Sequence, residues 1–156
     1  MMIVYYTQGE KTKLFAEALS EILGQPIYRL EPESLHRKSN FSFMIAALFL
    51  TISGKLHPII NMPASLPDEI YVCSPIWGGK LASPVKYFLE NADLSEKTVH
   101  LVITAGVPTE KYQAEALNYL TNSVKCVPGK VYIFAGTRGQ EKDIVKQHLE
   151  EVLYQL

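Results

Sequence analysis

The chain has 156 residues and a mass of 17.5 kDa, which is the size of one domain. Hydrophobic residues make up 47% and charged residues 20%, a composition that excludes a disordered or fibrous chain. Fifteen basic and sixteen acidic residues give a formal charge of −1, so no net positive field exists to attract nucleic acid or an anionic membrane. Two cysteines are too few for a disulfide framework. The N-terminus has neither a basic leader nor a small-residue cleavage site, so we expect a cytoplasmic protein.

Short apolar runs alternate with helical stretches along the chain. In chain order the expected elements are strand Met2–Tyr6, helix Lys11–Leu23, strand Pro26–Leu30, strand Ile70–Cys73, helix Ser83–Leu89, strand Val99–Ile103, helix Glu110–Thr121, strand Lys130–Ala135 and helix Gln140–Tyr154. Ser83 is expected to cap its helix, with Pro84 in the first turn. Near-continuous apolar strands separated by helices predict an α/β fold, a three-layer, doubly wound sheet of five parallel strands.

A long segment, at about residues 31–66, interrupts this alternation between the second and third strands. Its centre, Phe41–Ile52, is strongly apolar but falls short of the ~20 residues that span a bilayer, so no transmembrane segment is expected. We expect a helix packed on the sheet here. A lid over a ligand, a homodimer interface and a membrane-contacting face remain alternatives.

In an open parallel sheet, ligands bind beyond the carboxyl ends of the strands, which directs attention to three loops. Thr7–Thr12 leads from a strand into a helix N-terminus, where free backbone N–H groups favour an anion. Ser74–Lys80 carries the only tryptophan, Trp77, before a Gly-Gly pair, and an indole there can stack on a flat ligand. Thr104–Glu110 is the third loop. An inward, core-packed Trp77 and an ordinary capped turn at the first loop are the alternatives.

Several familiar sites are excluded. The chain has no G-x-G-x-x-G turn, no P-loop and no Gly-x-Ser-x-Gly elbow. Its four histidines are scattered, so no metal site is expected. Cys73 lies in a predicted strand and is interpreted as a buried, unreactive thiol.

At these residues the chain resembles the flavodoxin family over nearly its whole length. The resemblance rests on three blocks, Val4–Leu19, Ser74–Leu89 and Leu101–Gly106. It implies one flavodoxin-like domain over residues 1–156, with strand order 2-1-3-4-5 and FMN as the cofactor. The flavin supplies the redox chemistry in such proteins, so we name no catalytic side chain.

The resemblance also implies a set of cofactor-binding residues in the same three loops. Those around the phosphate would be Thr7, Gln8, Gly9, Glu10, Lys11 and Thr12, those beside the isoalloxazine Pro75, Ile76, Trp77, Gly78 and Gly79, and those on its pyrimidine side Thr104, Ala105 and Gly106.

The first loop departs from the family pattern Ser/Thr-x-Thr-Gly-Asn-Thr. Glu10 stands in place of the glycine and Lys11 in place of the asparagine. Two unit charges 4 Å apart interact by roughly 4 kcal/mol at an effective dielectric of about 20, and by about 1 kcal/mol in water. A carboxylate that faces the phosphate would therefore weaken binding, and one that faces solvent would not.

Two functions follow from this resemblance. The first is an FMN protein that transfers electrons to a small-molecule or protein partner, or reduces a small acceptor such as a quinone. A net charge of −1 favours a small reductase over a dedicated carrier that docks through an acidic surface. The alternative is a binding or regulatory module of the same fold that has lost FMN through its altered phosphate loop.

Overall fold

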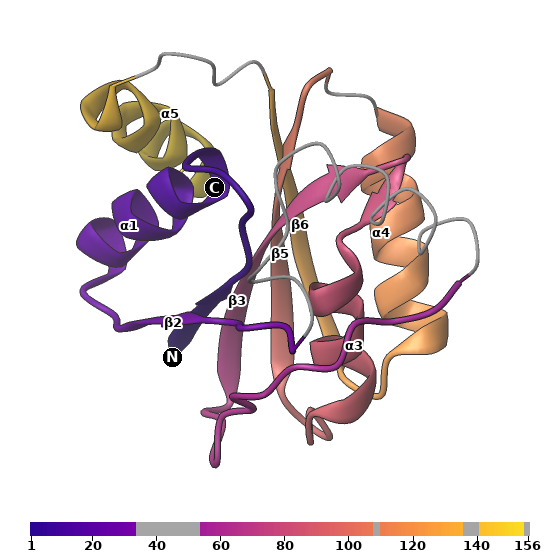
Figure 1. Cartoon of the computed structure of the whole chain (residues 1–156). Helices are drawn as coiled ribbons and strands as arrows, with labels where there is room; N and C mark the ends of the chain where they lie inside the picture. Colours follow the sequence, from indigo (N-terminus) through magenta and orange to yellow (C-terminus); the bar gives the residue numbers. More distant parts are fainter. Residues whose placement is uncertain (34–53, 108–109, 136–140, 155–156) are drawn as a thin grey trace.

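The computed structural model describes residues 1–33, 54–107, 110–135 and 141–154. Strands and helices alternate along these ranges, as the sequence predicts (Figure 1). The elements are β1 (Met2–Tyr5), α1 (Lys11–Leu23), β2 (Ile27–Arg29), β3 (Glu69–Trp77), β4 (Lys80–Leu81), α3 (Ser83–Asn91), β5 (Thr98–Ala105), α4 (Glu110–Ser123), β6 (Val127–Ala135) and α5 (Lys142–Tyr154).

Five of the strands form one parallel sheet in the order β2-β1-β3-β5-β6. The short strand β4 lies off this path and pairs with β3 alone, in the antiparallel sense. With β4 set aside, the order is the predicted 2-1-3-4-5. Val4 pairs with Val72, and Cys73 pairs with Val102, so the three central strands run side by side with their carboxyl ends at one edge.

Helices cover both faces of the sheet and make a three-layer molecule. Helices α1 and α5 lie on one face, and α3 and α4 lie on the other (Figure 1). On the first face Phe15 and Phe134 pack with their ring centroids 4.8 Å apart. On the second face Phe88 and Leu101 are fully buried. Burial of this kind contributes about 25 cal/mol per Å² of apolar surface, so the strands with the most buried side chains hold the layers together.

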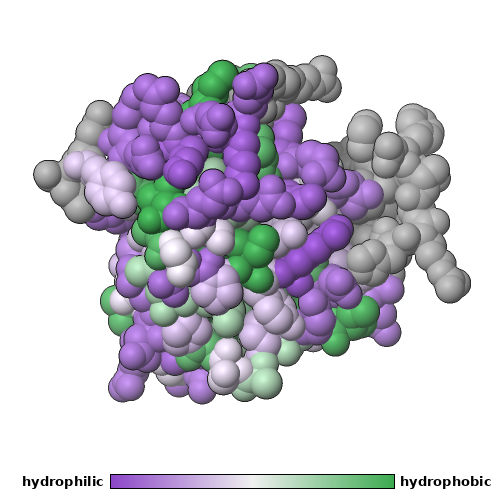
Figure 2. Space-filling view, turned by 90° about the vertical axis from the view of Figure 1, so that its left-hand side faces the viewer, coloured by the Kyte–Doolittle hydropathy of each residue, from purple (hydrophilic) through white to green (hydrophobic). Residues whose placement is uncertain are grey.

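The outer surface of α1 and α5 is mostly hydrophilic, with hydrophobic residues scattered over it (Figure 2). Glu21 of α1 forms ion pairs with Lys142 and Lys146 of α5, which link the two helices at this surface. The Lys142 ammonium, which hydrogen-bonds to the Glu21 carboxylate, holds the pKa of that carboxyl below its usual range. This face is therefore a solvated surface.

Helix α1 has the predicted bounds and is followed by a glycine that ends it. Gly24 takes a left-handed conformation, with φ 62°, and its N–H donates to the Ser20 carbonyl oxygen. Glycine adopts this conformation without the penalty that a Cβ imposes.

The predicted cap of α3 is wrong. The residue before the helix is Ala82, which makes no side-chain capping bond, and Ser83 is already helical. The hydroxyl of Ser83 instead accepts a hydrogen bond from the backbone N–H of His57 and contacts the ring of the same histidine. Ser83 therefore fastens a residue from the long segment between β2 and β3 to the start of α3.

The described ends of that long segment are tied to the sheet edge. Pro32 and Ile59 form an isolated antiparallel bridge, and the Asn61 side chain bonds to the Arg29 carbonyl and the Glu31 N–H. The apolar stretch Phe41–Ile52, expected to form a helix, lies outside the described residues.

Candidate functional site

The three loops singled out in the sequence meet at one edge of the sheet. The strand register places Tyr5 beside Cys73 and Pro75 beside Thr104, so the carboxyl ends of β1, β3 and β5 are neighbours. The buried hydroxyl of Thr12 lies 2.8 Å from that of Thr104 and joins the first loop to the third.

An aromatic contact joins the first loop to the second. The rings of Tyr6 and Trp77 meet edge to face, with centroids 5.4 Å apart and an interplanar angle of 85°. Burial raises the pKa of the Tyr6 hydroxyl well above its usual range, so it stays protonated, and it donates weakly to the Gln8 side chain at 3.4 Å. The second loop is thus anchored to the first through Trp77.

Glu10 occupies the N-cap position of α1, and its carboxylate faces solvent rather than the end of the helix. Its backbone is right-handed, with φ −89° and ψ −16°, so replacing the family's glycine causes no strain here. Its side chain is 86% exposed and lies 3.3 Å from Lys13, and it makes no capping bond. The first backbone N–H groups of a helix have no partner within it, so this end of α1 keeps donors for an anion.

The two threonine hydroxyls of the first loop are buried and already engaged. Thr7 donates to the Gly9 carbonyl oxygen, and Thr12 shares its hydrogen bond with Thr104. Each hydroxyl has one proton to donate, so Thr7 can bond to a phosphate only by turning away from Gly9.

Backbone near this end is open to an approaching group. A Cβ added at Gly9 or Gly106 would meet no atom within 4 Å. Lys11, the first residue of α1, is half-buried and adds a positive charge to the first loop. The backbone at Gly9 and Gly106 is therefore accessible beside the carboxyl ends of β1 and β5.

The second loop is largely strand. β3 continues through Pro75 and Ile76 to the half-buried Trp77, and β4 returns directly from Lys80. Between them Gly78 and Gly79 make a two-residue turn with φ 54° and 82°. Positive φ at both central positions is typical of the turn that suits the twist of a hairpin, so the glycine pair has a structural reason that the sequence analysis did not give. Thr104 and Ala105, also expected in a loop, end strand β5.

A cavity that the sequence analysis missed lies beside this hairpin. It has a volume of about 290 Å³ and is enclosed by the hairpin, α3 and α4; we call it the hairpin cavity. Its apolar lining comes from Ile76, Leu81 and Ala116, and its aromatic lining from Tyr112 and Tyr119. Two residues predicted to lie beside the isoalloxazine, Ile76 and Gly79, also line this cavity. The sequence analysis did not connect them with α4, where Tyr112, Ala116 and Tyr119 recur along one helix face.

The remaining candidates form no site. Cys73 is fully buried, and burial raises the pKa of its thiol far above the usual range, so it is unreactive as expected. Among the residues that the structure describes, no three His, Cys, Asp or Glu side chains gather where they could hold a metal ion. Within those same ranges, no helix is both long and apolar enough to cross a membrane.

Comparison with known proteins identifies the fold. No family model and no curated protein matches the sequence. A predicted flavoprotein from Bacteroides uniformis has a similar structure, with a TM-score of 0.71 and 21% identity over 96% of each chain. A flavoprotein from Lactobacillus acidophilus, solved in complex with FMN, gives a TM-score of 0.68 and 23% identity over 85% of this chain and 91% of its own.

A short-chain flavodoxin associated with a bacterial microcompartment is a more distant neighbour. Its TM-score is 0.51, with 14% identity over 97% of this chain and 95% of its own. These similarities extend over nearly the full length, and they agree with the strand order described above. The chain therefore has the flavodoxin-like fold.

Proposed function

We propose that this protein binds FMN where the first, second and third loops meet, and uses it to transfer electrons to, or reduce, a small acceptor such as a quinone. The observation that carries the proposal is the convergence of an uncapped helix N-terminus, the half-buried Trp77 and the end of β5 at one sheet edge. A protein of this fold from Lactobacillus acidophilus is solved with FMN.

The residues present fit an FMN phosphate. The backbone N–H groups of Glu10, Lys11 and Thr12, at the start of α1, would bind the phosphate oxygens, and the Lys11 ammonium would offset their charge. Open space at Gly9 leaves room for a group that approaches the backbone closely. Glu10 faces solvent and is paired with Lys13, which removes most of the repulsion that its position in the sequence suggested.

The chain's own residues would bind and orient the flavin. Trp77, held edge to face by Tyr6, offers an aromatic surface beside the hairpin turn. Thr104, Ala105 and Gly106 would line the pyrimidine side. When bound, FMN supplies the one- and two-electron chemistry, and the protein tunes it through packing and hydrogen bonds.

A second function is supported by one specific feature, the closed hydrogen bonding of the first loop. Thr7 bonds to Gly9 and Thr12 to Thr104, so both hydroxyls are satisfied without a phosphate. This favours a binding or regulatory module of the same fold that works without FMN.

Titration of the purified apo-protein with FMN, followed by quenching of flavin fluorescence, distinguishes the two functions. We expect FMN to bind and riboflavin, which lacks the phosphate, to bind much more weakly. In the FMN complex we expect the Thr7 hydroxyl to turn from Gly9 to the phosphate, and a hydrogen bond to a charged group contributes ~1.5–3 kcal/mol. Replacing Thr7 by Val should therefore weaken FMN binding by roughly ten- to hundredfold and leave riboflavin binding unchanged.

The matched control is Thr121→Val, because Thr121 is exposed on α4 and bonds only to the backbone of its own helix. No binding of either flavin would contradict the proposal and favour the module without cofactor. Equal binding of FMN and riboflavin would mean that the first loop does not hold the phosphate.

A further inference from the structure

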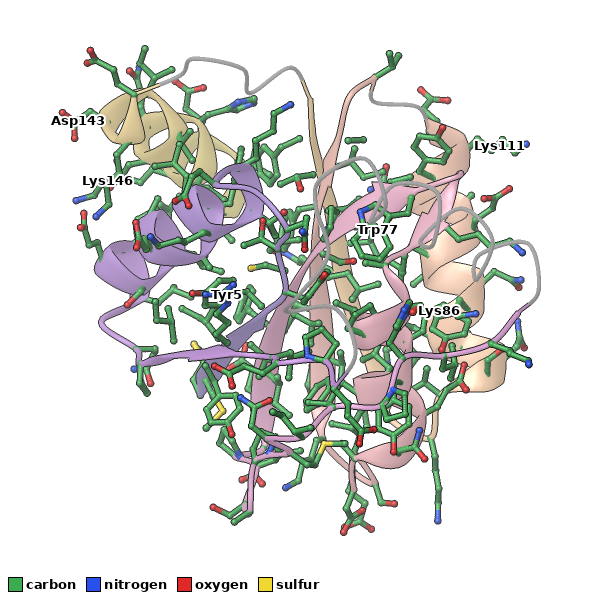
Figure 3. The ribbon with its side chains drawn as sticks, viewed as in Figure 1. Tyr5, Trp77, Lys86, Lys111, Asp143 and Lys146 are labelled. Atoms are coloured by element: carbon green, nitrogen blue, oxygen red, sulfur yellow. The ribbon has the colours of Figure 1, made fainter. Side chains whose placement is uncertain are left out.

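The hairpin cavity combines flat aromatic surfaces with an excess of positive charge. Its apolar lining and its two tyrosine rings are joined by the side chains of Lys80 and Lys86, with Glu115 as the one acidic residue. Figure 3 shows Trp77, Lys86 and Lys111 on the side of the sheet covered by α3 and α4, away from Asp143 and Lys146 on the opposite side.

Acidic side chains offset this positive charge only in part, since Glu115 lines the cavity and Glu90 lies at the Tyr119 hydroxyl. Within the described part of the chain, neither Lys80 nor Lys86 forms an ion pair. Glu115 is paired with Lys111 at 3.7 Å, so its charge is already partly balanced. Lys80 and Lys86 also border a small neighbouring pocket together with Lys55, which adds a third ammonium to the same surface. The surface at this cavity is thus locally basic, with Lys55, Lys80 and Lys86, although the net charge of the molecule is −1.

The aromatic wall is held in place before any ligand arrives. The Tyr119 hydroxyl donates to the Glu90 carboxylate at 2.6 Å, and the Lys86 ammonium lies 5.1 Å from the centroid of the Tyr119 ring. Burial and the nearby Glu90 raise the pKa of Tyr119 above its usual range, so the hydroxyl stays neutral and bonded. A fixed ring with a cation over it provides both a stacking surface and a charge for a flat anionic group.

The volume limits the ligand. About 290 Å³ lies near the lower end of the ~300–1,000 Å³ of drug-sized pockets, which suits one or two fused rings and is too small for a dinucleotide. A purely apolar ligand would leave the lysines unused, and a small inorganic anion would leave the tyrosine and aliphatic walls unfilled.

We propose that the hairpin cavity binds a small planar aromatic anion, with its rings against Tyr112 and Tyr119 and its acidic group at Lys80 and Lys86. This site is separate from the first loop, where the FMN phosphate is placed, and it does not depend on flavin binding. The hairpin contributes to both sites, because it carries Trp77 as well as Ile76, Gly79 and Lys80.

Calorimetric titration of the whole chain with 2-naphthoate tests this site, with uncharged 2-naphthamide as the matched probe. We expect naphthoate to bind at least tenfold more tightly than naphthamide, and the difference to shrink as salt is raised. Methionine at position 80 or 86 keeps the apolar stem and removes the charge. Each of Lys80→Met and Lys86→Met should weaken naphthoate binding by roughly three- to tenfold and leave naphthamide unaffected.

Lys146→Met is the charge-matched control, because Lys146 lies on α5 on the opposite side of the sheet. Equal affinity for the two probes, or equal loss in the Lys146 and Lys86 variants, would overturn the proposal. Chemical-shift changes recorded by NMR should fall on the hairpin, α3 and α4. Changes confined to residues 7–12, or displacement of naphthoate by FMN, would assign the ligand to the flavin site and overturn the separate one.

Discussion

At the scale of single residues, the orientation of the Glu10 side chain determines how strongly the altered first loop would repel a phosphate. The sequence places a carboxylate where the flavodoxin pattern has glycine, and this substitution alone suggests repulsion of a phosphate. The structure turns the carboxylate outward, where water and Lys13 screen it. The sequence therefore predicted a negative charge at this position but not which way the side chain points.

Replacing Glu10 by Gln tests that orientation. An exposed ion pair contributes ~0–1 kcal/mol, so we expect FMN affinity to change by less than about fivefold at low salt and not at all at high salt. The measurement is an FMN titration at two ionic strengths. Glu17→Gln is the control, since Glu17 also lies near Lys13, at 3.8 Å, one turn further along α1. Tightening by more than tenfold in the Glu10 variant would mean that its carboxylate turns toward the phosphate.

Trp77 offers a second test, because it is the only tryptophan and its fluorescence reports on one place in the molecule. FMN bound beside it should quench that fluorescence in proportion to occupancy. Trp77→Ala should weaken FMN binding by about 1–3 kcal/mol through lost stacking and burial. Tyr6→Phe, which keeps the ring that meets Trp77, should bind FMN normally. Unchanged affinity in the alanine variant would make Trp77 a packing residue only.

At the scale of elements, the sequence located the helices and strands well but ended β3 too early. The predicted strand stops at Cys73, yet Pro75 lies inside β3, paired with Thr104. β1 ends at Tyr5, opposite Cys73, so no ladder bond is lost where the proline lacks its N–H. The β4 strand was missed for a different reason, because two residues are too few to give a periodic pattern.

The glycine pair of the hairpin gives a prediction at this scale. Gly79 has φ 82°, and a Cβ there would lie 3.8 Å from the Tyr112 ring, so backbone strain rather than a clash opposes substitution. Gly79→Ala should lower the free energy of unfolding by about 1–2 kcal/mol, the cost of a left-handed conformation. Urea unfolding of the apo-protein measures it.

Gly9→Ala is the matched control for stability. Gly9 is outside the left-handed region, and a Cβ added there would meet no atom within 4 Å. The urea midpoint of the Gly9→Ala variant should therefore hardly differ from that of the unchanged protein. Equal destabilisation of the two variants would contradict the assignment of Gly79 to a strained turn.

At the scale of the whole molecule, the limit of sequence reasoning is distance along the chain. The parallel sheet was predictable because apolar runs and helices alternate locally, and its strand order was implied by the resemblance to the flavodoxin family. The hairpin cavity was not, because Lys80, Lys86 and Tyr119 come from three elements that only the packed fold brings together. The contact of Thr12 with Thr104, across 92 residues, is of the same kind.

His100, in β5, links the stability of the whole fold to pH. Its Nδ1 accepts a hydrogen bond from the Lys130 N–H at 3.0 Å, its ring stacks on Tyr71, and its Nε2 lies 3.2 Å from the Glu69 carboxylate. Burial lowers the pKa of this imidazole, the Lys130 charge lowers it further, and Glu69 only partly opposes them. The folded state therefore holds His100 neutral at a pH where the unfolded chain takes up a proton.

The sign of the effect follows from that difference. Because the unfolded state binds more protons, the free energy of unfolding should fall as pH drops below about 6.5, the ordinary pKa of histidine. Urea midpoints measured from pH 7.5 to 5 should decrease, and His100→Gln should flatten that part of the curve. His148→Gln, at an exposed position on α5, is the control. An unchanged slope in the His100 variant would show that other groups carry the acid sensitivity, and that protonated His100 is accommodated by Glu69.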